Sequence, residues 1–160
     1  SECNLQSASF LNDNEHQEIK TRVNHFFPNC KSYQKVKNVL NNESKGVYQG
    51  KIFVKDVAQK TDAYQLSKAV LLSEPSEFES QPELEIYAYD VKCSHGSTSG
   101  SLDKDSIYYL MTRGLSKKES TKLLVNGFLN EVTESIKSNS IKNFIKNKLE
   151  EQLSNEYKKD

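Results

Sequence analysis

A cysteine and a histidine two residues apart, Cys93 and His95, are the residues of this chain best suited to chemistry. On a strand, residues i and i+2 point to the same face, so a thiolate and an imidazole would lie side by side. Such a pair can ligate iron or zinc, or can act as a nucleophile and its base. A structural metal site needs about four ligands. Any further ligands would therefore have to come from elsewhere in the fold or from a second chain.

His25 and Cys30 form a second, weaker candidate pair, five residues apart. They could meet across a turn of the chain and bind a metal ion. A half-buried strand histidine and a core cysteine explain them better, because a free cysteine behaves as a small apolar residue. We therefore keep both as secondary metal-ligand candidates and expect structural roles for them.

The common hydrolase and phosphate-binding patterns do not occur in the sequence. It contains no Gly-x-Ser-x-Gly, no Gly-rich phosphate loop and no His-Glu-x-x-His. Glu83 and Glu85 would share one face of a strand and could imitate a polysaccharide-cleaving pair. A solvated strand face explains them better, so we expect no catalytic residue and no enzyme.

Charge and cysteine usage exclude further classes. The chain carries 22 Lys+Arg and 22 Asp+Glu, so no excess of positive charge is available to meet nucleic-acid phosphates. No apolar run approaches the roughly 20 residues that cross a bilayer. Three cysteines without Cys-x-x-Cys spacing predict a reducing compartment and no disulfide framework. We expect neither nucleic-acid nor membrane binding.

Strand patterns occupy the part of the chain before residue 100. Period-two alternation is clearest in 47–54, and turn residues such as Pro28-Asn29 and Asn41-Asn42 separate the runs. The last three runs recur at roughly 18–20 residues, which suggests the stacked coils of a solenoid. A β-sandwich would give a similar pattern, although no Asn-Gly or Asp-Gly hairpin joins the strands. The predicted strands are 9–11, 18–27, 47–54, 64–72 and 84–91.

Helical spacing replaces the strand pattern after residue 100. A first helix over 103–112 should end near Gly114, and Ser116-Lys117-Lys118-Glu119 fits a capping box that opens a second. A third helix begins near Ile141. The apolar stripes predicted for the second and third helices consist of Leu123, Leu124, Phe128, Val132 and Ile136, and of Ile141, Phe144, Ile145, Leu149 and Leu153.

Several segments, taken in order, carry a family resemblance. They are His25…Pro28-Asn29-Cys30-Lys31-Ser32, Gly46–Val54, Ala58–Gln65, Leu71-Leu72-Ser73, Pro82–Gly96, Leu102-Asp103 and Thr112–Leu115. Together they resemble the SufB/SufD family of iron–sulfur cluster assembly scaffolds, over about residues 25 to 132. The form Lys92-Cys93-Ser94-His95-Gly96 is similar to the SufD branch rather than to SufB.

The resemblance implies a mainly β fold, a right-handed parallel β-helix followed by a C-terminal α-helical domain. Only part of the β-helix would be present, with its C-terminal coils in residues 1–100 and the helical domain in 101–160. Family members are longer than 160 residues. Since the only methionine is Met111, we expect this chain to be a piece of a longer protein.

The resemblance also implies a role in the SUF system. The chain would pair with a SufB-like scaffold subunit and a SufC-like ATPase, or form a homodimer, and would help to form or load clusters at a subunit interface. In the family the histidine matching His95 is functional, and the cysteine matching Cys93 is implicated beside it. The cargo would be a transient iron–sulfur cluster or iron, with none stably bound in the isolated chain.

The same resemblance locates the ATPase and the compartment. SufC contacts in the family fall on the first helices after the β-helix, here about residues 103 to 132. The compartment would be the cytoplasm or the plastid stroma. The docking candidates are Asp103, Ile107, Tyr108, Leu110, Leu115, Leu123, Leu124 and Phe128.

Two other functions fit a β-helix with a helical extension. One is an extracellular protein that binds or cleaves polysaccharide, and the other is a bare interaction module. The cysteines and the lack of a signal segment count against the first, although truncation would weaken the second of these points.

Overall fold

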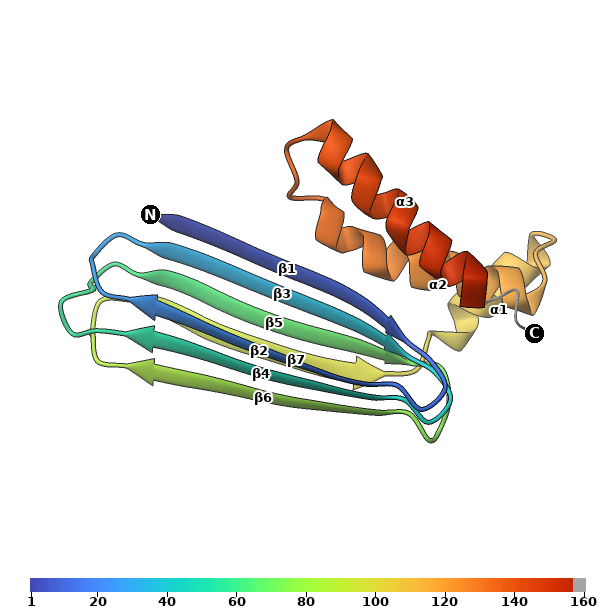
Figure 1. Ribbon diagram of the computed structural model, residues 1–160, viewed down its shortest axis with the longest axis horizontal. Helices are drawn as coiled ribbons and strands as arrows, with labels where there is room; N and C mark the ends of the chain where they lie inside the picture. Colours follow the sequence, from blue (N-terminus) through green and yellow to red (C-terminus); the bar gives the residue numbers. More distant parts are fainter. Residues whose placement is uncertain (157–160) are drawn as a thin grey trace.

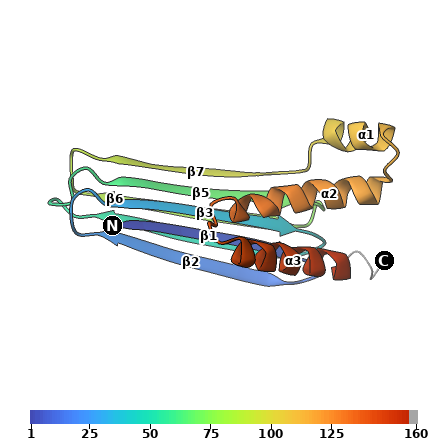
Figure 2. The same ribbon diagram turned by 90° about the horizontal axis from the view of Figure 1, so that it is seen from above.

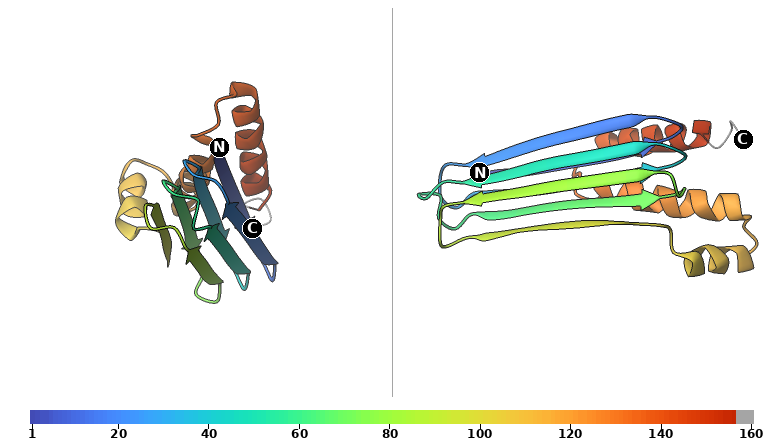
Figure 3. Two further views of the ribbon diagram at one scale, coloured as in Figure 1. Left: turned by 90° about the vertical axis from the view of Figure 1, so that its left-hand side faces the viewer. Right: turned by 90° about the horizontal axis from the view of Figure 1, so that it is seen from below.

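Seven strands followed by three α-helices make up the protein in a computed structural model that describes residues 1–156. All strand pairs are parallel and fall into two sheets. One sheet contains β1 (Glu2–Leu11), β3 (Lys31–Leu40), β5 (Asp62–Leu71) and β7 (Lys92–Gly100), in that order. The other contains β2 (His16–His25), β4 (Lys45–Val54) and β6 (Glu77–Ile86). The chain alternates between the two sheets, which stack face to face (Figure 1, Figure 3).

This arrangement confirms the predicted parallel β-helix and corrects its repeat. Lys31 pairs with Glu2 on one side and with Asp62 on the other, so one coil takes 29 to 31 residues in the first sheet. The predicted repeat of roughly 18–20 residues was wrong as a coil length. Consecutive strands lie in opposite sheets, and only every second strand returns to the same sheet.

Two strand predictions were wrong for identifiable reasons. β3 was missed because its inner face carries Ser32, Gln34 and Asn38, which hide the apolar alternation. The run 84–91 is not one strand, since β6 ends at Ile86 and β7 begins at Lys92.

Gln81-Pro82 was predicted as a turn but lies inside β6. Glu77 and Tyr87 donate their backbone N–H groups to Ser44 and Val54, so odd-numbered residues of β6 bond to β4. The nitrogen of Pro82 therefore faces the free edge of the sheet, where the missing N–H costs no ladder bond.

Helix α1 (Lys104–Thr112) and helix α2 (Lys117–Asn130) begin and end at the predicted caps. Asp103 accepts hydrogen bonds from two backbone N–H groups at the start of α1, and Gly114 adopts φ 98° after it. Ser116 and Glu119 form the predicted capping box of α2. A short 3₁₀ turn, η1 (Glu131–Thr133), follows and leads toward α3 (Asn139–Glu156).

The apolar faces of the helices pack on the outside of the β-helix. α2 and α3 lie over the outer face of the four-stranded sheet, at the end where its strands finish (Figure 1, Figure 2). Leu123 is exposed in α2, so the predicted stripe was displaced by one residue, and α2 ends at Asn130, short of Ile136. In α3, Ile141 and Phe144 are exposed, whereas Leu149 and Leu153 are buried as predicted. The buried cluster consists of Phe10, Val39, Val70, Val125, Leu129, Leu149 and Leu153.

Candidate functional site

Strand β7 carries the candidate pair at the edge of its sheet. The four-stranded sheet ends at β7 and the opposite sheet ends at β6, so no further described strand follows β7 (Figure 2). Cys93 is in register with Ala63, and His95 with Gln65. Both register partners are 1% exposed and lie on the inner face of the coils. Cys93 and His95 therefore share the inner face of the last strand.

The two side chains have different surroundings. Cys93 is half-buried and packs against the apolar cluster that contains Val54, Ala63 and Ala88. Burial raises the pKa of the Cys93 thiol, and a hydrogen bond to the backbone of Ala63 opposes the shift only in part. A metal ion or a nearby base would have to remove the proton before Cys93 could act as a thiolate near neutral pH.

His95 is exposed at the open end of the coils. Within residues 1–156 its ring makes no hydrogen bond or ion pair to another side chain. Both ring nitrogens are thus available, and a neutral imidazole is a good ligand for iron. The pair alone supplies two ligands. In the described part of the chain, no group of three or more His, Cys, Asp or Glu residues is arranged to hold a metal ion.

His25 and Cys30 make separate contacts. The Nε2 atom of His25 lies 2.9 Å from the hydroxyl oxygen of Ser32, and burial lowers the pKa of the ring. Cys30 accepts a hydrogen bond from the Ser1 hydroxyl at 3.2 Å and contacts the Pro28 carbonyl. No hydrogen bond joins His25 to Cys30 among the described residues. These contacts fit structural roles in the core for both residues.

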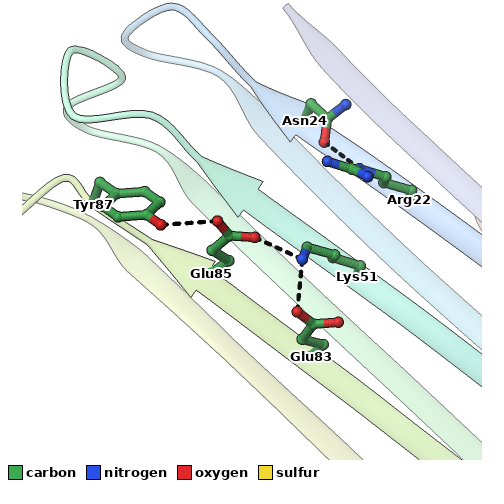
Figure 4. A network of polar contacts seen from close by, with 6 residues as sticks. All are labelled: Arg22, Asn24, Lys51, Glu83, Glu85 and Tyr87. Atoms are coloured by element: carbon green, nitrogen blue, oxygen red, sulfur yellow. Dashed lines mark hydrogen bonds and ion pairs between the residues drawn. The ribbon is translucent and has the colours of Figure 1, made fainter.

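Glu83 and Glu85 lie on the outer face of β6 and are tied to a lysine. Lys51 Nζ lies 2.6 Å from a carboxylate oxygen of each, and Tyr87 donates its hydroxyl to Glu85 at 2.9 Å (Figure 4). The hydrogen bonds from Lys51 and Tyr87 lower the pKa of Glu85. A glycosidase acid needs a raised pKa, so this pair lacks the chemistry of a polysaccharide-cleaving site.

A polar row inside the coils was missed by the sequence analysis. Gln34, Gln65 and His95 are in register on the inner faces of β3, β5 and β7. The signal in the sequence is a recurrence at 31 and 30 residues, which becomes visible only once the true coil length is known.

The predicted ATPase-docking residues fall into three groups. Tyr108 and Leu123 are exposed, at 70% and 52%, while Asp103 serves as the cap of α1. A cavity of about 430 Å³ lies between α1, α2 and the end of β5, with Ile107, Tyr108 and Leu71 in its lining. The half-buried remainder comprises Ile107, Leu110, Leu115, Leu124 and Phe128.

Comparison with known proteins gives a family and several relatives. Residues 1–128 match the family model described as "SUF system FeS cluster assembly, SufBD core domain". The chain is 33% identical over 138 residues to the iron–sulfur cluster assembly protein SufD of Escherichia coli, which covers 86% of this chain and 33% of that protein.

Two photosynthetic organisms contain further relatives. An iron–sulfur cluster assembly SufBD family protein of Synechocystis is 36% identical over 71% of this chain and 25% of its own length. The chloroplastic protein ABCI7 of Arabidopsis thaliana is 32% identical over 68% of this chain and 23% of its own length. The chain therefore spans a third or less of the length of these relatives.

Proposed function

Because this chain belongs to the SufBD family of the SUF system, whose members support a role in iron–sulfur cluster assembly, we propose that it acts as a SufD-like scaffold component. In this role it helps to form or load clusters at an interface with a second scaffold subunit. It contributes ligands and a binding surface, not catalysis of its own.

The observation that carries this proposal is the placement of Cys93 and His95 on the inner face of an edge strand. His95 offers an unoccupied imidazole nitrogen to ferrous iron. Cys93, once deprotonated, offers a thiolate to iron or to incoming sulfur. Two ligands hold a cluster weakly unless a partner adds more, which suits a cluster that must later be passed on.

Two surfaces accommodate the proposed partners. The free edge of β7 presents unpaired backbone groups to which a strand of a SufB-like subunit, or of a second copy, can add. The cavity beside α1 and α2, with exposed Tyr108 at its rim, offers the SufC-like ATPase a place to insert an apolar side chain.

The compartment follows from the same proposal. No helix in the described residues is long and apolar enough to span a bilayer. A scaffold of this kind works where thiols stay reduced, in the cytoplasm or in the plastid stroma.

Anaerobic reconstitution with the SufB-like and SufC-like partners tests the proposal through the iron and sulfide content of the complex. Replacing His95→Ala in the full-length protein should leave folding and partner binding intact while cluster content falls at least tenfold. Ser94→Ala is the matched control, since Ser94 lies on the same strand, exposed and facing outward. Normal cluster content in the His95→Ala complex would remove His95 from the site.

A further inference from the structure

The polar row that ends at His95 contains a buried amide held at one end only. Gln65 is 1% exposed, and its Nε2 donates a hydrogen bond to the Tyr48 hydroxyl at 2.9 Å. Tyr48 is fully buried, and its hydroxyl lies 3.1 Å from that of Thr21. The carbonyl oxygen of Gln65, Oε1, is also buried and has no hydrogen-bond partner among the described residues.

The fold makes room for this amide at Gly50. A Cβ atom on Gly50 would overlap the Gln65 Nε2 atom and crowd the Tyr48 hydroxyl. The amide and the phenol therefore occupy space that any larger residue at position 50 would take. One end of the Gln65 amide is fixed by a built contact, which leaves Oε1 as a fixed, unused acceptor in the interior.

We propose that Gln65 is a positioning residue for His95. His95 occupies the next rung on the same inner face, in register with Gln65. Oε1 accepts the N–H of the imidazole, directly or through one water molecule. This fixes the ring tautomer and leaves the lone pair of the other nitrogen directed outward toward iron.

Chemistry favours this assignment for two reasons. Metal-binding histidines usually donate their second N–H to a carbonyl or carboxylate, which orients the ring and raises its basicity. A buried carbonyl without a donor is also unfavourable, so His95 gains a partner that Oε1 otherwise lacks. The inference rests on the proposed function, because it assigns His95 the role of an iron ligand.

Gln34 is the competing partner for Oε1 and also the matched control. It is fully buried, in register with Gln65 on the side away from His95, and neither of its amide atoms has a hydrogen-bond partner among the described residues. Gln34→Met removes an equally buried amide of the same row without touching the proposed contact. Methionine is unbranched and fills the same space in both variants.

The test reads the His95 tautomer by long-range ¹H–¹⁵N spectroscopy of the metal-free chain at about pH 8, where ordinary imidazoles are neutral. One tautomer should dominate in the parent and in Gln34→Met. In Gln65→Met the ratio should move to that of histidine in a short peptide. Gly50→Ala should do the same, because it displaces the Gln65 amide while leaving residue 65 unchanged. Backbone amide spectra identify the variants that fold.

Ferrous iron titration under anaerobic conditions separates this inference from the proposed function. Iron affinity should fall about tenfold in Gln65→Met and remain unchanged in Gln34→Met. A peptide-like tautomer ratio in the parent, or equal tautomer shifts in Gln65→Met and Gln34→Met, would overturn the positioning role. Iron binding that His95→Ala leaves unchanged would instead overturn the proposed function, whatever the tautomer.

Discussion

At the scale of single residues, the Cys93 thiol is held protonated by its apolar neighbours. Burial raises its pKa, so less thiolate is present at any given pH than in an exposed cysteine. In a chain carrying Cys3→Ser and Cys30→Ser, the rate of alkylation by iodoacetamide should therefore rise with pH along a curve whose midpoint lies above that of a cysteine peptide.

Denaturant supplies the control for this titration. In urea the midpoint should return to the peptide value, because the apolar neighbours no longer surround the sulfur. A folded-state midpoint at or below the peptide value would contradict the burial argument. Added ferrous iron should slow alkylation if Cys93 ligates it.

The sequence located the site pair but not the residues behind it. Cys93 and His95 share a face because i and i+2 always do on a strand, which is a local property. Gln65 lies 30 residues before His95, and its relation to His95 depends on the coil length. Local patterns carry no information about that length, so Gln65 and Tyr48 could not be assigned to the site in advance.

At the scale of elements, the glycines of the helical region have opposite roles. Gly127 lies in α2 with open space where a Cβ would be, whereas Gly114 adopts φ 98° after α1. Gly127→Ala should raise the free energy of unfolding by about 0.5–1 kcal/mol, since glycine has the lower helix propensity. Gly114→Ala should lower it by about 1–2 kcal/mol through backbone strain. Urea unfolding of both variants measures the two changes, and equal signs would contradict the assignment.

Lys37 attaches the end of α2 to the β-helix. Its side chain is buried, donates to the Phe128 carbonyl at 2.8 Å, covers the Phe128 ring and pairs with Glu131. Lys37→Met keeps most of the side-chain volume but removes the donor. The free energy of unfolding should fall by about 1–3 kcal/mol, because a buried carbonyl loses its partner. Lys35→Met, on the same outer face and half-buried, is the control and should change it by less than about 1 kcal/mol.

The Lys37 contact also predicts a pH signature. Burial alone would raise the pKa of Glu131, but the hydrogen bond and charge of Lys37 outweigh it, so the pKa lies below its ordinary value. A lowered carboxylate pKa stabilises the fold above the unfolded-state pKa, and this contribution is lost as the pH falls through the folded-state pKa. The stability difference between parent and Lys37→Met should therefore narrow in acid, below about pH 4.5. A constant difference would show that Glu131 does not contribute.

Local chemistry explains which elements the sequence could predict. The caps at Asp103, Ser116 and Gly114 are decided by a few adjacent residues, and all three were found. β3 was hidden because Lys37 is buried only when α2 covers it, and because Gln34 is buried only when coils stack on both sides. Burial of such residues follows from tertiary structure, which hydropathy does not contain.

At the scale of the whole molecule, the stacked coils leave an unpaired strand where the candidate site lies. β7 donates to β5 through even-numbered residues, since the Lys92 N–H bonds to the Thr61 carbonyl. In a parallel sheet, alternate residues bond to opposite neighbours, so the N–H groups of odd-numbered residues point to the free edge. Ser99 presents such a group and is exposed.

Proline substitutions at adjacent positions use this alternation to test strand addition. Ser99→Pro removes an edge N–H and adds a ring there, so it should leave the isolated chain folded but weaken association with a SufB-like subunit at least tenfold. Thr98→Pro removes a ladder N–H to β5 and should instead destabilise the chain itself. Sedimentation of the mixed subunits and urea unfolding of each variant separate the two effects. Undiminished association of Ser99→Pro would show that the partner binds elsewhere, and the ligands that complete Cys93 and His95 would then have to reach them from outside the sheet edge.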